Sequence, residues 1–257
     1  MLSKIKSQIR KFKYKLRFNS KFQCRENDEK FYHVNNLRSE GFSIDKSFLK
    51  KSNIAQKIIE CYEKIPEEEI NQIISSNNNK EFVRDGAEDT NIKSFKKKIT
   101  NYFNEDDLYE FANQNVLLSE IEQYFGFAPK LRYISVWVDF PITYNTPTWS
   151  QLFHRDNDDY HLVKVFFYLN HVSEQNGPFQ FLNKTHYDSW ENFSPNKLSL
   201  FQKKNLKSAI GEKGMLILCD TNGYHRGLTP AAGHRAMLTV NYVSNNPKPG
   251  FLKNIID

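Results

Sequence analysis

The chain has 257 residues, is 39% hydrophobic and 14% aromatic, and carries a formal net charge of +6. A chain of this length can bury a sizeable core, and barrels of this size commonly form one domain. It contains no run of about 18 apolar residues that would predict a membrane-spanning helix. Its cysteines, Cys24, Cys61 and Cys219, are too widely spaced to indicate a zinc site or a disulfide framework, which favours a reducing, cytoplasmic compartment.

The positive charge is concentrated at the N-terminus. Residues 1–25 contain nine Lys or Arg and no Asp or Glu, which leaves 27 basic and 30 acidic residues in the rest of the chain. Apolar residues recur there at steps of three and four, which predicts a basic amphipathic helix: Leu2, Ile5, Ile9, Phe12 and Leu16. We favour docking of this helix on its own domain. The alternatives are a disordered tail, or weak contact with an anionic membrane surface that would make the protein peripheral to a membrane. The basic run lacks the aromatic–glycine signature of a nucleic-acid module, so no nucleic-acid partner is expected.

Residues 26–257 are expected to form one domain, with a helical part at about 41–127 and a barrel at about 130–245. Polar residues 26–40 and 75–90 predict loops. Apolar periodicity predicts a helix that follows Asp45 and Ser47 and runs through Ile65, and a short second helix around Ile70, Ile73 and Ile74. Further helices are predicted at Ile92–Phe103, Leu108–Ala112 and Val116–Phe125, the last ended by Gly126.

From Lys130 onward the sequence pattern changes to β-branched and aromatic runs between turn residues. Strands are predicted at Leu131–Phe140, Thr148–His154, Val163–Leu169, Phe179–Leu182, Gly214–Cys219 and Arg235–Val243. The Lys- and Asn-rich segment Ser189–Ala209 predicts a short helix plus a loop at the rim of a pocket. The register of the first strand stays open: the pocket receives either Tyr133, Ser135, Trp137 and Asp139, or Arg132 from the opposite face.

The triplet His154-Arg155-Asp156 indicates a metal site. On a strand its imidazole and carboxylate lie two residues apart and point to the same face. His225, from a distant strand, can supply a third ligand. Two His and one carboxylate with open positions are typical of non-heme Fe(II) oxygenases. Arg235, ten residues beyond His225, can bind a carboxylate through two parallel hydrogen bonds.

The other histidines are interpreted as structural or polar groups. His161 follows an acidic stretch and is the rival ligand. His171 and His186 lie in turn-like contexts, which favours hydrogen-bonded surface or supporting roles, with His186 a candidate for the pocket wall. His234 neighbours Arg235, so on a strand it faces the opposite way.

The order of motifs over about residues 130–245 resembles the phytanoyl-CoA dioxygenase-like family of Fe(II)/2-oxoglutarate-dependent oxygenases. The shared motifs are His154-Arg155-Asp156, a strand ending in Leu169-Asn170, Asn176-Gly177-Pro178, Thr185-His186, the distal His225 and then Arg235. The chain departs from the family pattern at Gly227, where a serine often stands, at His171 in place of an acidic residue, and at Met215 in place of an aspartate.

The resemblance implies an α+β fold with a mainly β core, in which helices pack around a double-stranded β-helix (jelly-roll) barrel. It implies that His154, Asp156 and His225 are the catalytic iron ligands, that Arg235 anchors 2-oxoglutarate, and that O2 and ascorbate take part. The implied activity is hydroxylation of a small organic substrate with release of succinate and CO2. The alternatives are a non-catalytic barrel that binds a small molecule or sugar, and another metal-dependent barrel enzyme, an isomerase or zinc hydrolase.

Overall fold

The computed structural model describes residues 32–77, 81–84, 87–93, 95–142, 149–156, 158–186, 198–244 and 255–256. The predicted basic helix within residues 1–25 lies outside this part of the chain, as do residues 189–197 of the predicted insertion. None of the helices in the described part is both long enough and apolar enough to cross a membrane.

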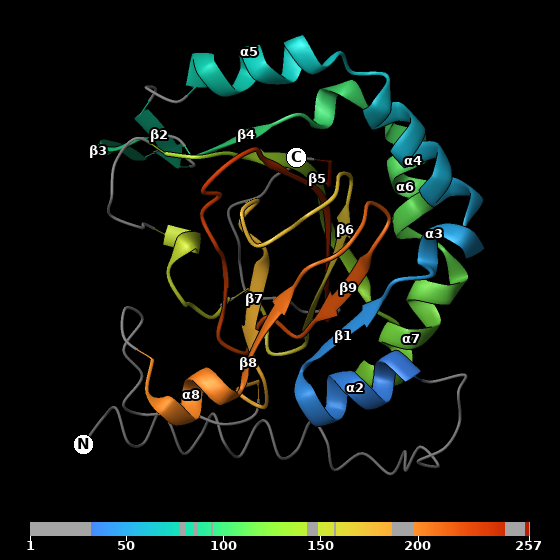
Figure 1. Ribbon diagram of the computed structural model, residues 1–257. Coiled ribbons are helices and arrows are strands. Elements are labelled where there is room, and N and C mark those ends of the chain that lie inside the picture. The colour runs from blue at the N-terminus through green and yellow to red at the C-terminus, as the bar shows by residue number, and fades with distance from the viewer. Residues whose placement is uncertain are drawn as a thin grey trace.

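Two antiparallel sheets form the core (Figure 1). The larger sheet has the order β1 (Phe42–Asp45), β9 (Leu216–Cys219), β6 (Leu162–Tyr168), β11 (Arg235–Val243), β5 (Lys130–Asp139) and β4 (Lys96–Lys98). The smaller sheet has the order β10 (His225–Gly227), β7 (Phe179–Leu182) and β8 (Leu206–Ala209). A separate pair consists of β2 (Glu81–Arg84) and β3 (Ala87–Lys93). The predicted α+β fold with a mainly β core is confirmed.

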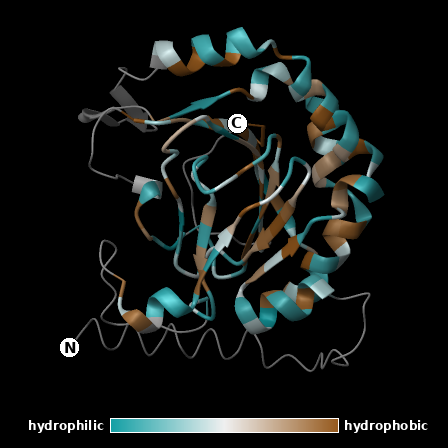
Figure 2. Ribbon diagram, in the orientation of Figure 1, coloured by the Kyte–Doolittle hydropathy of each residue, from teal (hydrophilic) through white to brown (hydrophobic). Residues whose placement is uncertain are grey.

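Helices cover the outer face of the larger sheet (Figure 1). They are α2 (Tyr32–Glu40), α3 (Phe48–Lys51), α4 (Asn53–Glu63), α5 (Glu67–Asn77), α6 (Glu105–Ala112) and α7 (Asn115–Phe125), while α8 (Leu200–Lys204) lies beside the smaller sheet. Figure 2 shows apolar residues on the sheet side of these helices and polar residues outside. The contact is close: the rings of Phe111 in α6 and Phe167 in β6 are 5.1 Å apart between centroids.

Alternation along the strands divides the larger sheet into a helix-facing side and a barrel-facing side. On β11, Leu238 and Val240 join the helix-packed core, so Met237 and Thr239 face the barrel. The antiparallel register then places four β5 residues on the barrel side: Tyr133, Ser135, Trp137 and Asp139. This settles the register left open by the sequence. Arg132 lies at a register shift and has no partner on β11.

Several predicted elements were wrong. Residues 26–40 were expected to be a loop, but α2 forms there because Val34 and Leu37 are fully buried against the rest of the fold. The expected helix Ile92–Phe103 is instead the end of β3, then β4 and a 3-10 turn at Thr100–Tyr102. Strand pairing with β5 overrides the local preference there.

The remaining differences come from turns and from strand pairing. The expected strand Thr148–His154 is a 3-10 turn at Trp149–Gln151 followed by a single bridge at His154. The helix predicted after Ser47 and through Ile65 is broken at Ser52, whose hydroxyl caps α4 by accepting the Ala55 N–H at 3.1 Å. The predicted loop 75–90 contains the end of α5, strand β2 and the start of β3. Within Ser189–Ala209 the expected helix is α8, but the expected loop is strand β8, which pairs with β7.

A buried acid in α7 makes stability depend on pH. Glu120 is 7% exposed, and its Oε2 accepts the Val34 N–H at 3.1 Å in the first turn of α2. Burial raises the pKa of Glu120 from 4.5 to about 7, against the opposing effect of that hydrogen bond. A carboxyl with a raised folded pKa favours the folded state while protonated, so this stabilisation is lost as pH rises from about 4.5 to about 7.

We expect Glu120→Gln, which keeps the hydrogen-bond acceptor, to remove this pH dependence. The melting temperature of the variant should fall less than that of the wild type between pH 5 and pH 8, as measured by circular dichroism. Glu122→Gln, at an exposed position of the same helix, is the matched control. Equal pH slopes for wild type and Glu120→Gln would contradict the assignment.

Candidate metal centre

A single β-bridge brings together two histidines that are distant in the sequence. His154 and His225 form an isolated antiparallel bridge, in which each N–H donates to the other's carbonyl oxygen at 3.0 Å. The imidazole centroids are consequently 4.3 Å apart. A further backbone hydrogen bond, from Asp156 N to Thr221 O at 2.9 Å, fixes the next part of the same segment. Pairing with the start of β10 thus replaces the full strand expected before His154.

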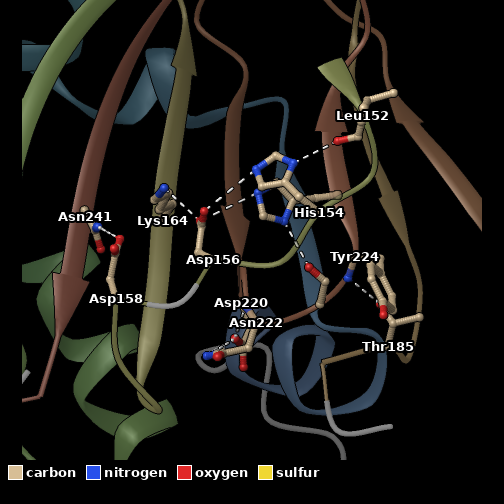
Figure 3. A network of polar contacts seen from close by, with 12 residues as sticks. Leu152, His154, Asp156, Asp158, Lys164, Thr185, Asp220, Asn222, Tyr224 and Asn241 are labelled. Atoms are coloured by element: carbon tan, nitrogen blue, oxygen red, sulfur yellow. Dashed lines mark hydrogen bonds and ion pairs between the residues drawn. The ribbon is translucent and has the colours of Figure 1, made fainter. Parts of the chain in front are cut away.

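Asp156 completes the group (Figure 3). Its Oδ1 lies 3.8 Å from His154 Nε2, and its Oδ2 lies 3.6 Å from His225 Nε2. One ligand atom from each of the three residues lies within 4.8 Å of the other two. Among the described residues, this is the one group of three or more His, Cys, Asp or Glu side chains that could hold a metal ion. The structure therefore brings His154, Asp156 and His225 together in one group.

Backbone carbonyls orient both imidazoles. His154 Nδ1 lies 2.9 Å from Leu152 O, and His225 Nδ1 lies 2.9 Å from Gly223 O (Figure 3). A carbonyl oxygen only accepts hydrogen bonds, so each Nδ1 donates its proton to the backbone, and Nε2 is the ring nitrogen that faces Asp156. This arrangement is the one that orients histidine ligands in metal sites.

The ionisation states also suit a cation. Burial, assisted by the neighbouring His154, lowers the pKa of His225 to about 3, so its imidazole is neutral at physiological pH. Burial alone would raise the pKa of Asp156, but the Lys164 ammonium and both imidazoles hold it well below its usual range. A charged carboxylate and neutral imidazoles are the forms that bind metal. These residues therefore fit a divalent transition metal ion.

Lys164 is the residue of this site that sequence reasoning did not place. It lies on β6 with its side chain 13% exposed, and its Nζ is 2.8 Å from Asp156 Oδ2 (Figure 3). Burial disfavours the ammonium, but the Asp156 carboxylate outweighs burial and raises the pKa of Lys164. The sequence feature that could have indicated its role is a lysine between Val163 and Val165, at a barrel-facing position of an otherwise apolar strand.

Arg235 lies deeper, at the start of β11. It is 3% exposed, and its Nε and Nη2 donate to Asp139 Oδ2 at 3.3 and 2.9 Å, while Nη1 donates to Gly177 O. Gly227, two residues beyond His225 on β10, packs against it, and a Cβ there would lie 2.6 Å from Nη2. The departure from serine at Gly227 is thus explained by the close approach of the guanidinium.

The remaining histidines stay outside the metal group among the described residues. His161, the rival ligand, packs edge-on against Phe127 with centroids 4.9 Å apart. His171 is exposed and pairs with Glu212 at 3.0 Å, and His234 shares a 2.8 Å hydrogen bond with Tyr62. His186 is not a surface residue: it is fully buried, with Nε2 3.3 Å from a backbone carbonyl of α2.

Comparison with known proteins finds the same architecture in solved enzyme structures. No family model matches the chain, and no curated protein matches it by sequence. EctD from S. alaskensis with bound Fe is 13% identical with a TM-score of 0.55, covering 91% of this chain and 83% of EctD. The non-heme alpha ketoglutarate dependent carbocyclase SnoK from nogalamycin biosynthesis is 12% identical with a TM-score of 0.54, covering 84% and 83%.

A third match carries both a metal and a co-substrate. HygX from Streptomyces hygroscopicus, with nickel, 2-oxoglutarate and hygromycin B bound, is 13% identical with a TM-score of 0.51, covering 84% of this chain and 86% of HygX. Identities this low establish the architecture rather than the activity. The chain therefore shares its fold, helices packed on a double-stranded β-helix barrel, with these three proteins.

Proposed function

We propose that the protein is an Fe(II)- and 2-oxoglutarate-dependent oxygenase that hydroxylates a small organic substrate. The preformed face of His154, Asp156 and His225 carries this proposal, because two imidazoles and one carboxylate would leave positions free on the ion. A fold shared with enzymes crystallised with Fe or with nickel and 2-oxoglutarate supports it. Iron bound there would supply the activation of O2.

Arg235 is the proposed anchor for the distal carboxylate of 2-oxoglutarate. Asp139 occupies the Nε edge of the guanidinium, and Gly177 O takes one Nη1 hydrogen. A guanidinium has five N–H groups, so one hydrogen on Nη1 and one on Nη2 remain for a carboxylate. Asp139 thereby fixes the plane in which Arg235 can receive the co-substrate.

The proposed overall reaction converts 2-oxoglutarate, O2 and a substrate C–H group into succinate, CO2 and a C–OH group. One oxygen atom enters succinate and the other enters the product, so the reaction balances without a further reductant. Ascorbate would serve only to keep the iron reduced. Tyr133, Trp137 and Phe166 lie at barrel-facing positions of β5 and β6, so the proposed site would have aromatic side chains in its wall.

The proposal also includes the family, the type of reaction and the location of the protein. Membership of the phytanoyl-CoA dioxygenase-like family is supported by the order of the motifs from His154 to Arg235. Hydroxylation is the simplest outcome of this chemistry, although the shared fold also serves a carbocyclase. A cytoplasmic location is part of the proposal, supported by the wide spacing of the cysteines, of which Cys61 and Cys219 are free thiols in the described residues.

Turnover of the purified protein tests the proposal. With Fe(II), ascorbate and air, we expect succinate to form from 2-oxoglutarate, slowly without substrate and faster when a fitting substrate is added. Replacing Fe(II) with Zn(II), or removing O2, should stop succinate formation. A substrate turned over equally well with Zn(II) and without O2 would indicate a zinc hydrolase instead.

A further inference from the structure

The ammonium of Lys164 lies within the metal centre, where the three-ligand proposal gives it no role. Its Nζ is 2.8 Å from Asp156 Oδ2, and the same oxygen is 3.6 Å from His225 Nε2. Oδ1, the other carboxylate oxygen, faces His154 Nε2 at 3.8 Å. The two oxygens of Asp156 therefore have different neighbours before any ion is bound.

The position of Lys164 is fixed by the sheet. It lies on β6 between two neighbouring strands, opposite Asn241 of β11 and Cys219 of β9, and its Nζ is 5.7 Å from the centre of the Tyr133 ring. The other nearby acid, Asp158, is engaged by Asn241 Nδ2 at 3.1 Å. Asp156 is thus the carboxylate that Lys164 pairs with directly.

We infer that Lys164 is a positioning residue, which holds Oδ2 of Asp156 so that Oδ1 alone is offered to the metal ion. This inference rests on the proposed function. A carboxylate that binds through one oxygen leaves an additional coordination position for 2-oxoglutarate and O2. The ammonium also adds one positive charge beside the ion, so that ion, carboxylate and ammonium together carry two positive charges. That charge is equal and opposite to the charge of the 2-oxoglutarate dianion.

The two effects have opposite signs, which separates this role from a merely structural one. Lys164 competes with the ion for Asp156 and repels it, so its removal should strengthen metal binding. Its removal should also weaken 2-oxoglutarate binding, because the dianion loses an attractive charge and a coordination position. Loss of structure, in contrast, would weaken both.

The test uses Co(II), which remains divalent in air and has a visible spectrum, and then 2-oxoglutarate titrated into the Co(II)-loaded protein. We expect Lys164→Met to bind Co(II) about tenfold more tightly and 2-oxoglutarate about tenfold more weakly than the wild type. Lys164→Arg, which keeps the charge, should stay within about threefold of the wild type for both. Lys98→Met removes a barrel-facing lysine that stacks on Trp137 5.3 Å away, and it should change neither affinity appreciably.

The outcomes are distinct. Unchanged affinities in Lys164→Met, a loss of both, or an Arg variant that behaves like the Met variant would overturn the inference. If Lys164→Met does not fold, Lys164→Gln is measured in its place, with the same opposite changes expected. A metal-bound wild-type structure with both Asp156 oxygens on the ion would also overturn it. A wild-type protein that binds neither Co(II) nor 2-oxoglutarate would refute the proposed function itself.

Discussion

An Asp156→Ala protein is expected to release no succinate above background from 2-oxoglutarate under Fe(II), ascorbate and air. The reason is the loss of the one anionic ligand among the three residues of the site. Replacing outer partners of metal ligands commonly costs about 10–100-fold in affinity or activity, so loss of a ligand should exceed about 100-fold. Isothermal titration with Co(II) and a succinate assay would measure the two effects separately.

The substitution has a second consequence, which sets the choice of controls. Without Asp156 the largely buried Lys164 ammonium loses its partner, so the variant should also melt at a lower temperature. Asp158→Asn is the matched control, since Asp158 lies two residues away and contacts Asn241 rather than the ligand group. It should retain metal affinity within about twofold. Unchanged succinate release in Asp156→Ala would defeat the assignment of the site.

The second large effect concerns Arg235. We expect Arg235→Lys to weaken 2-oxoglutarate binding at least about tenfold while leaving metal affinity unchanged, because lysine cannot make the two parallel hydrogen bonds. Complete loss of such a desolvated charge pair costs roughly 2–5 kcal/mol, so an alanine variant should be affected more strongly. Calorimetric titration of 2-oxoglutarate into the Co(II)-loaded protein would measure both.

Truncation of Arg235 also leaves Asp139 buried without its partner, since the two side chains are 2.9 Å apart and almost fully enclosed. The double variant Arg235→Ala, Asp139→Asn removes that unpaired charge and separates lost stability from lost binding. Arg226→Lys is the control, because Arg226 donates to Gln180 at 2.8 Å on the alternate face of β10. Normal 2-oxoglutarate affinity in the Arg235 variants would mean that Lys164 or Arg132 anchors the co-substrate.

The parts of the fold that sequence patterns predicted are those whose signal is local. Strands Phe179–Leu182 and Arg235–Val243 have the predicted bounds because β-branched and aromatic residues lie between turn residues. The end of α7 was predicted from Gly126, because glycine commonly ends a helix. In the structure Gly126 has a φ of +81°, a left-handed conformation that favours glycine. In the site, His154 and Asp156 lie close together as their spacing predicts, although a single bridge at His154 stands there instead of a strand.

The parts that were missed depend on contacts between distant segments. Strand β4 contains three consecutive lysines, a poor strand sequence, and it forms because it pairs with β5, with Lys96 stacked on Trp137 at 4.3 Å. Helix α2 depends on Glu120, 86 residues away in the chain. The pairing of Lys164 with Asp156 depends on which strands lie side by side, which no local pattern of residues specifies.

The β-bridge between His154 and His225 also determines how the protein would acquire its ion. In small zinc domains the ligands are scattered until metal arrives, so ion binding and folding are one event. Here reciprocal 3.0 Å backbone hydrogen bonds already hold the imidazoles opposite each other. With the His154 side chain still 32% exposed, an ion can enter from solvent and leave again while the barrel stays intact. Under the proposed function, iron lost by oxidation would therefore be replaced without a round of unfolding.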